Sequence, residues 1–105
     1  MKEISVTELK AKMDAKENIQ IIDVREPYEA EICEIGGLLI PMGDVVENAE
    51  KIKKDIPVIV HCRSGKRSAA VINALETQFG YTNLHNLKGG ILAWADEVDT
   101  NMSKY

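Results

Sequence analysis

Two short apolar runs constrain the fold of this chain most strongly. The run IQIIDV covers residues 19–24, and the run PVIVHC covers residues 57–62. Both are nearly unbroken and rich in valine and isoleucine, which is typical of strands buried on both faces in a parallel sheet covered by helices. We therefore expect these two runs to be central strands of such a sheet.

Weaker strand candidates and helical segments alternate around these two runs. The strand candidates are ISV near the start, LLIP at 38–41 and LHNL at 84–87; the helical segments are 6–15, 43–54, 68–80 and 89–98, with a short helix starting at Pro27. The alternation predicts one α/β domain over residues 1–105, with three α/β/α layers and a mainly parallel sheet of about five strands.

Two of the helical segments carry more detailed expectations. Residues 43–54 should form a helix capped by Asp44 and Glu47, with its apolar side made of Val45, Val46, Ala49 and Ile52. The helix that begins at Arg67–Ser68 should end at Gly80, a suitable residue for a helix C-terminus, with its apolar face made of Val71, Ile72, Leu75 and Phe79.

Composition narrows the classes of partner. The chain has 105 residues, 45% of them hydrophobic and 29% charged, and a net charge of −4. A negative balance argues against general binding to nucleic acid or to anionic membranes. There is no signal peptide pattern and no apolar run of the ~20 residues that a membrane span needs, so we expect a cytoplasmic location. The short chain with one apparent core suggests a monomer. Cys33 and Cys62 should stay reduced there, and no cysteine and histidine spacing indicates a metal site.

The segment after the second run concentrates chemistry around one cysteine. Cys62 should lie at the carboxyl end of its strand, where open α/β sheets place ligand sites. The residues that follow are Arg63, Ser64, Gly65, Lys66, Arg67 and Ser68. With Gly65 free to adopt a positive φ, a tight loop of this kind turns its backbone N–H groups inward, next to the N-terminus of the following helix. The pattern predicts an anion-binding loop.

The anion nearest to that loop is the Cys62 thiolate. A helix N-terminus and nearby cations lower a cysteine pKa from about 8.5 to between about 3.5 and 7.5. We therefore expect Cys62 to be an ionised nucleophile at neutral pH, the alternative being a buried structural cysteine beside solvated surface cations.

Three segments of the chain carry a resemblance to a known family. They are IIDVRE at 21–26, EAEICEIGGLLIPMGDV at 29–45 and the stretch from 58 to 94 that ends in LKGGILAW. Together they resemble the single-domain rhodanese family of sulfurtransferases. The resemblance covers nearly the whole chain. It implies that Cys62 takes a sulfane sulfur from a small anionic donor such as thiosulfate, becomes a persulfide, and passes the sulfur to cyanide, a small thiol or a protein thiol. It implies no cofactor.

The resemblance leaves two further functions to weigh. One is a sulfur-relay or regulatory module that acts on a protein partner and turns over little thiosulfate. The other is a phosphatase, since cysteine-based phosphatases also occur on a rhodanese-like fold. Those phosphatases place one residue more between the cysteine and the arginine than the four that separate Cys62 from Arg67. The shorter loop suits a sulfur atom better than a phosphate, which argues against this activity.

Four residues outside the loop are also candidates. Asp23 and Arg25 follow the first strand and should lie beside the site, where Arg25 either orients the donor or, as we favour, forms an ion pair with Asp23 or Glu26 that fixes the local geometry. His61 should point away from Cys62, because adjacent strand residues face opposite sides of a sheet. Cys33 is expected to be a small core residue.

Overall fold

The computed structural model describes residues 1–105 and has the expected α/β architecture. Its elements, in chain order, are β1 (Glu3–Ile4), α1 (Val6–Asp14), β2 (Gln20–Asp23), α2 (Pro27–Ile32), β3 (Leu38–Leu39), the 3₁₀ helices η1 (Met42–Asp44) and η2 (Val46–Lys51), β4 (Val58–His61), α3 (Lys66–Phe79), β5 (Leu84–Leu87) and α4 (Gly90–Glu97). None of the helices is long and apolar enough to cross a lipid bilayer.

The five strands form one parallel sheet in the order β1-β5-β4-β2-β3. The two apolar runs are the central neighbours β2 and β4, paired from Gln20 opposite Val58 to Asp23 opposite His61. All four side chains of β4 are buried, as expected for a strand covered on both faces. The predicted five-stranded parallel sheet is therefore confirmed.

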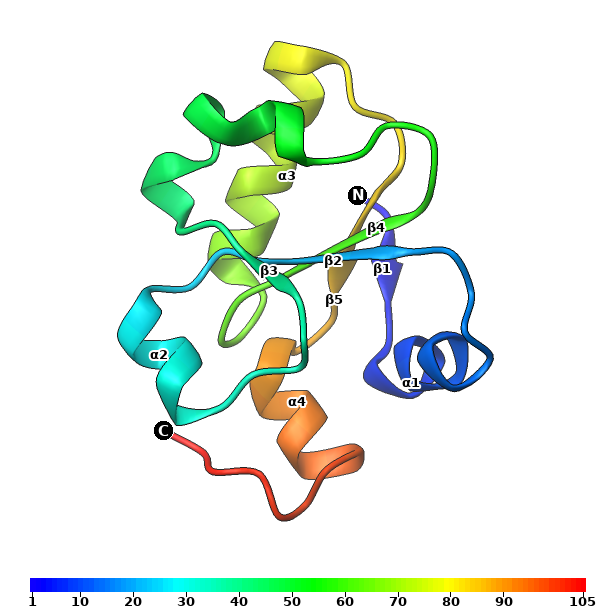
Figure 1. Cartoon of the computed structure of the whole chain (residues 1–105), viewed down its shortest axis with the longest axis vertical. Coiled ribbons are helices and arrows are strands. Elements are labelled where there is room, and N and C mark those ends of the chain that lie inside the picture. Colours follow the sequence, from blue (N-terminus) through cyan, green and yellow to red (C-terminus); the bar gives the residue numbers. More distant parts are fainter.

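Helices cover both faces of the sheet and divide the core in two. In Figure 1, α3 and the 3₁₀ helices lie on one side of the sheet, and α1 and α4 lie on the other. The larger apolar cluster, with 14 buried residues, packs under α3 and η2, while a smaller one of 8 residues packs under α1 and α4 and includes Trp94. The three-layer prediction is confirmed.

The segment 43–54 differs from its prediction. It forms two short 3₁₀ helices instead of one α-helix, with a kink at Asn48 and no side-chain cap. The cause is local: the Asn48 side chain donates to the Asp44 carbonyl at 2.8 Å, which is the acceptor that the Asn48 N–H would use in an α-helix. The kink also turns Val46 outward, so this side chain is 52% exposed instead of buried.

The helix that follows Cys62 begins and ends close to the predicted residues. It begins one residue earlier, at Lys66, and ends at Gly80, whose φ of 69° is the left-handed value typical of a helix C-terminus. Phe79 is 36% exposed, so the apolar face is shorter than expected.

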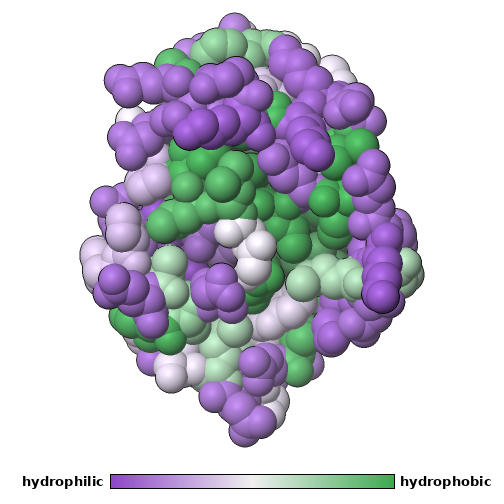
Figure 2. Space-filling view, viewed as in Figure 1, coloured by the Kyte–Doolittle hydropathy of each residue, from purple (hydrophilic) through white to green (hydrophobic).

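Figure 2 shows apolar residues gathered in the middle of one face, where Figure 1 places the β3 edge of the sheet, and hydrophilic residues around them.

Candidate active site

The loop from Cys62 to Lys66 joins the carboxyl end of β4 to α3. Cys62 directly follows β4 and is 1% exposed. Gly65 has a φ of 105°, which lets the chain reverse direction immediately before α3. The loop thus brings the N-terminus of α3 next to the Cys62 sulfur, in the arrangement that the sequence suggested.

Polar hydrogens surround that sulfur. The Gly65 N–H donates to Cys62 Sγ at 3.1 Å, and the Ser68 hydroxyl lies 3.4 Å from Sγ. Burial alone would raise the pKa of Cys62, but hydrogen bonds from the Ser68 hydroxyl and from the amides of Ser68, Gly65 and Ser64 outweigh it, so this pKa lies below its usual value. These hydrogen bonds favour the ionised form of the Cys62 thiol.

Asn86, on the neighbouring strand β5, fixes both groups that contact the sulfur. Ser68 Oγ donates to Asn86 Oδ1 at 2.6 Å, and Asn86 Nδ2 donates to the Gly65 carbonyl at 3.1 Å. The Ser68 hydroxyl has one proton, so it can give that proton either to Asn86 or, by rotating, to an ionised sulfur. Asn86 was not among the predicted site residues, and the only signal in the sequence was an amide within the otherwise apolar run LHNL.

The opposite side of the loop is attached to α4. The Ile91 N–H donates to the Cys62 carbonyl at 3.1 Å, and the Leu92 N–H donates to the Arg63 carbonyl at 3.2 Å. These are first-turn amides that have no partner within their own helix. Gly90 permits this approach, since a Cβ at this position would lie 2.4 Å from the Arg63 carbonyl oxygen.

The cations of the loop do not all face the sulfur. Arg67 forms two hydrogen bonds with Glu29 of α2, NH1 to Oε1 at 2.7 Å and NH2 to Oε2 at 2.9 Å. Its contact holds the pKa of Glu29 at about 2, well below the usual range. Arg63, Ser64 and Lys66 are exposed. Glu29 was absent from the predicted site, and nothing in its sequence context marks it as a partner of Arg67.

Asp23 and Arg25 form a buried ion pair beside β2 and α2. Arg25 is fully buried, and its Nε and NH2 contact the two oxygens of Asp23 at 3.0 and 2.8 Å. Arg25 also donates to the carbonyls of Glu29 and Cys33. With a further hydrogen bond from NH1 to the Tyr105 hydroxyl at 3.1 Å, all five N–H donors of the guanidinium have protein acceptors. The guanidinium is therefore a brace between β2 and α2, and Glu26 is not its partner.

His61 and Cys33 lie next to this pair. His61 is fully buried, with Nδ1 3.3 Å from the Cys62 carbonyl oxygen and Nε2 3.8 Å from Asp23 Oδ2. Burial lowers the pKa of His61, which keeps the ring neutral. Cys33 is half-buried, with Sγ 3.9 Å from Arg25 NH1, so it packs at the margin of the smaller cluster instead of inside it.

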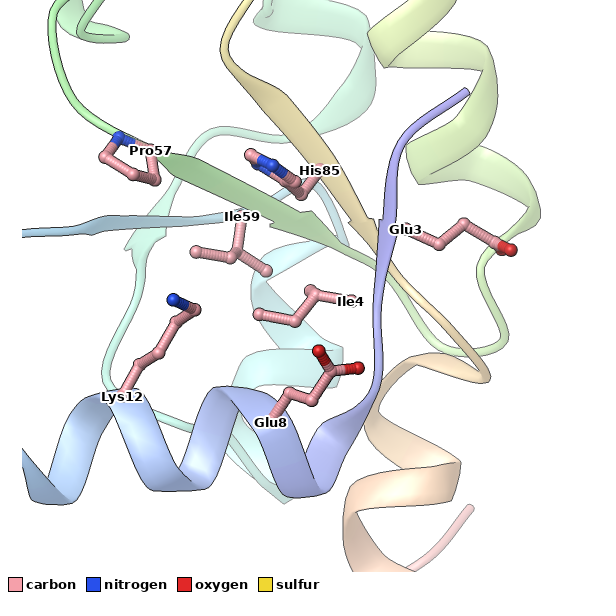
Figure 3. Close-up of a pocket in the computed structure, with 7 residues that line it drawn as sticks. All are labelled: Glu3, Ile4, Glu8, Lys12, Pro57, Ile59 and His85. Carbon is pink, nitrogen blue, oxygen red and sulfur yellow. The ribbon is translucent and has the colours of Figure 1, made fainter.

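A cavity of about 270 Å³ lies elsewhere in the molecule. Figure 3 shows it between α1 and the sheet, with Glu8 and Lys12 of α1 below Ile59 of β4. Pro57, which precedes β4, also lines it, whereas Cys62 follows the opposite end of that strand. No residue of the Cys62 loop lines this cavity, so it is not part of the site.

Comparison with known proteins agrees with this geometry. The family model described as Rhodanese-like domain matches residues 5–97. A putative sulfurtransferase of Bacillus subtilis is 42% identical over 99 residues, which cover 93% of this chain and 94% of that protein. A putative sulfur carrier protein of the same organism is 32% identical over 98 residues, covering 92% of this chain and 52% of that protein.

Solved structures lead to the same family. A rhodanese-like domain protein from Staphylococcus aureus matches with a TM-score of 0.83 and 33% identity, covering 100% of this chain and 99% of that one. The family model, the sulfurtransferase relative and the solved structure each match over most of the chain. This protein therefore belongs to the rhodanese-like domain family.

Proposed function

We propose that this protein is a sulfurtransferase that carries sulfane sulfur on Cys62. The observation that carries the proposal is the environment of Sγ, which accepts the Gly65 N–H at 3.1 Å, lies 3.4 Å from the Ser68 hydroxyl and has a lowered pKa. Relatives named sulfurtransferase support the same chemistry. A nucleophilic thiolate at the tip of a helix is what covalent sulfur transfer requires.

The reaction has two balanced halves. The Cys62 thiolate attacks the outer sulfur of thiosulfate; a new S–S bond forms, the S–S bond of thiosulfate breaks, and sulfite leaves with the electron pair. A thiophilic acceptor such as cyanide then attacks the outer sulfur of the persulfide, and the Cys62 thiolate leaves with its electron pair. The products are sulfite and thiocyanate, and no external oxidant or reductant is needed.

The loop supports both halves of this reaction. The outer sulfur of a persulfide lies about 2 Å beyond Sγ, among the amides of Ser64, Gly65 and Ser68, which act on Cys62. These dipoles are fixed before the reaction, so they stabilise the negative sulfur without rearrangement. The exposed cations Arg63 and Lys66 attract an anionic donor to a protein whose net charge is −4.

A relay module is the second candidate, and two observations favour it. One relative is named a sulfur carrier protein. In addition, Cys62 is only 1% exposed, which suits a stored persulfide shielded from small molecules in solution. A relay would accept sulfur stoichiometrically and deliver it to a protein thiol, with poor turnover of thiosulfate and cyanide.

Intact-protein mass spectrometry after thiosulfate treatment tests the proposal. We expect one added sulfur on the wild type and on Cys33→Ser, and none on Cys62→Ser. Added sulfur on Cys62→Ser, or none on the wild type, contradicts a Cys62 persulfide. Steady-state thiosulfate:cyanide turnover then separates the candidates, because an enzyme turns over many times and a relay stops near one equivalent.

A further inference from the structure

Tyr105 lies against the Cys62 loop although it is distant from it in sequence. The segment after α4 crosses the molecule and ends beside α2 (Figure 1). There the guanidinium carbon of Arg63 lies 4.8 Å from the centre of the Tyr105 ring, within the range of a cation–π interaction. Tyr105 therefore contacts the residue that directly follows Cys62.

Two hydrogen bonds fix the Tyr105 ring in this position. Its hydroxyl donates to Glu29 Oε2 at 2.6 Å and accepts from Arg25 NH1 at 3.1 Å. Burial, followed by the contact with Glu29, raises the pKa of Tyr105, so the phenol is neutral at physiological pH. The ring also packs against the smaller apolar cluster. Arg63 thus stacks on a support whose orientation is set by buried groups.

Arg63 differs from the neighbouring arginines in how its charge is balanced. The charge of Arg25 is offset by Asp23 at 2.8 Å, and that of Arg67 by Glu29 at 2.7 Å. Arg63 is exposed, and its side chain contacts the Tyr105 ring instead of a carboxylate. Its positive charge therefore remains uncompensated beside the loop, and the position of that charge depends on the ring.

We propose that Tyr105 is a positioning residue that holds the Arg63 guanidinium at the rim of the Cys62 loop and so gives Cys62 a preference for anionic over neutral reagents. For sulfur donors the inference rests on the proposed function, and it then names anionic donors as the favoured class. The electrostatic effect itself does not depend on sulfur transfer, because any reagent that attacks Cys62 experiences the same charge.

Alkylation with two reagents of different charge tests this inference. Iodoacetate is an anion and iodoacetamide is neutral. The first transfers a carboxymethyl group and the second a carbamidomethyl group to a thiolate, each with loss of iodide. The ratio of their second-order rate constants at Cys62, followed by peptide mass mapping at low ionic strength, cancels any change in the thiolate fraction. A purely structural role for Tyr105 would leave this ratio unchanged.

Three variants give the expected pattern. Tyr105→Leu removes the aromatic face, so we expect the iodoacetate:iodoacetamide ratio to fall at least about threefold. Tyr105→Phe keeps the aromatic face and its apolar packing but loses the two hydroxyl contacts, so its ratio should fall less than that of Tyr105→Leu. Tyr28→Leu is the matched control, since Tyr28 is 64% exposed on α2 and makes no hydrogen bond through its hydroxyl. Its ratio should not change.

A double-mutant cycle completes the test. In an Arg63→Ala background, Tyr105→Leu should cause no further fall in the ratio, because the charge that it positions is gone. An unchanged or raised ratio in Tyr105→Leu, an equal fall in Tyr105→Phe, or a fall that persists with Arg63→Ala overturns the inference. Failure of persulfide formation would overturn the proposed function and leave these alkylation ratios intact.

If the proposed function and this inference both hold, Tyr105→Leu should raise the KM for thiosulfate and leave kcat unchanged.

Discussion

The molecule stabilises negative charge in two adjacent regions by different means. Around Cys62, the sulfur is stabilised by backbone amides and the Ser68 hydroxyl. Between β2, α2 and α3, the carboxylates of Asp23 and Glu29 are stabilised by the guanidinium groups of Arg25 and Arg67. The first region relies mainly on hydrogen-bond dipoles, and the second on ion pairs, of which Asp23–Arg25 is buried and Glu29–Arg67 is partly buried.

This difference suits the two regions to different roles, a reactive sulfur in the first and rigidly held carboxylates in the second. A sulfur stabilised by dipoles keeps its negative charge available for attack, because no counter-ion is bound to it. A carboxylate in a two-point contact with arginine is fixed in place and chemically quiet. The cluster of cations after Cys62 in the sequence suggested direct action on the sulfur; in the structure, Arg67 instead ties the start of α3 to α2. Three experiments test this contrast.

The largest effect is expected from the buried ion pair. Arg25→Met leaves Asp23 buried without its partner, and the loss of such a partner costs about 3–5 kcal/mol of unfolding free energy. Replacing both residues, Asp23→Asn with Arg25→Met, removes the unpaired charge and should cost less than the single change. Urea denaturation measures both. A double variant less stable than the single one would contradict a bracing role for the pair.

An intermediate effect is expected from Glu29 and depends on pH. The pKa of Glu29 is about 2 in the folded protein, against an ordinary glutamate value of 4.5. A lowered folded pKa contributes stability above the unfolded pKa, and this contribution disappears as the pH falls through the folded value. The difference between these two pKa values corresponds to about 3 kcal/mol at pH 7.

Thermal or urea unfolding of wild type and Glu29→Gln between pH 7 and pH 2 measures this contribution. The variant should be less stable at pH 7, and the difference should shrink steadily from about pH 5 downward. A difference that stays constant over this range would mean that the Glu29 charge does not stabilise the fold.

The smallest effect is expected within the sulfur site. Ser68→Ala removes a hydrogen bond to Sγ and should raise the pKa of Cys62, so that alkylation by iodoacetamide below that pKa slows about two- to tenfold. The loss should vanish at alkaline pH. Ser64→Ala is the matched control, because Ser64 acts through its amide, which the change retains. Equal losses in both variants would mean that the hydroxyl of Ser68 has no specific role.

Local sequence patterns were sufficient to predict most of the architecture. The two apolar runs became the paired strands β2 and β4, since burial on both faces demands uninterrupted aliphatic side chains. The reversal at Gly65 and the end of α3 at Gly80 were also predictable, because both positions require a positive φ that glycine adopts at low cost. The prediction of one helix over 43–54 was wrong because the side-chain amide of Asn48 competes with the backbone N–H for the helical acceptor.

The surroundings of Cys62 could be predicted only in part. Its loop is continuous in sequence, so the pattern of glycine, serine and cations was visible. Asn86, Glu29 and Tyr105 come from three other elements, and their contacts depend on how those elements pack. A polar residue in a strand, a short helix or a tail has no local feature that reveals which distant side chain it meets.

The first turn of α4 limits the size of the Cys62 loop. The amides of Ile91 and Leu92 donate to the carbonyls of Cys62 and Arg63. The two segments are so close that a side chain at position 90 would not fit between them. An insertion after Cys62 would have to detach the loop from α4 or reshape that helix at the same time. Widening the ring to admit a bulkier anion is therefore a coordinated change in two distant segments, which makes such a switch of substrate class hard to reach by a single genetic event.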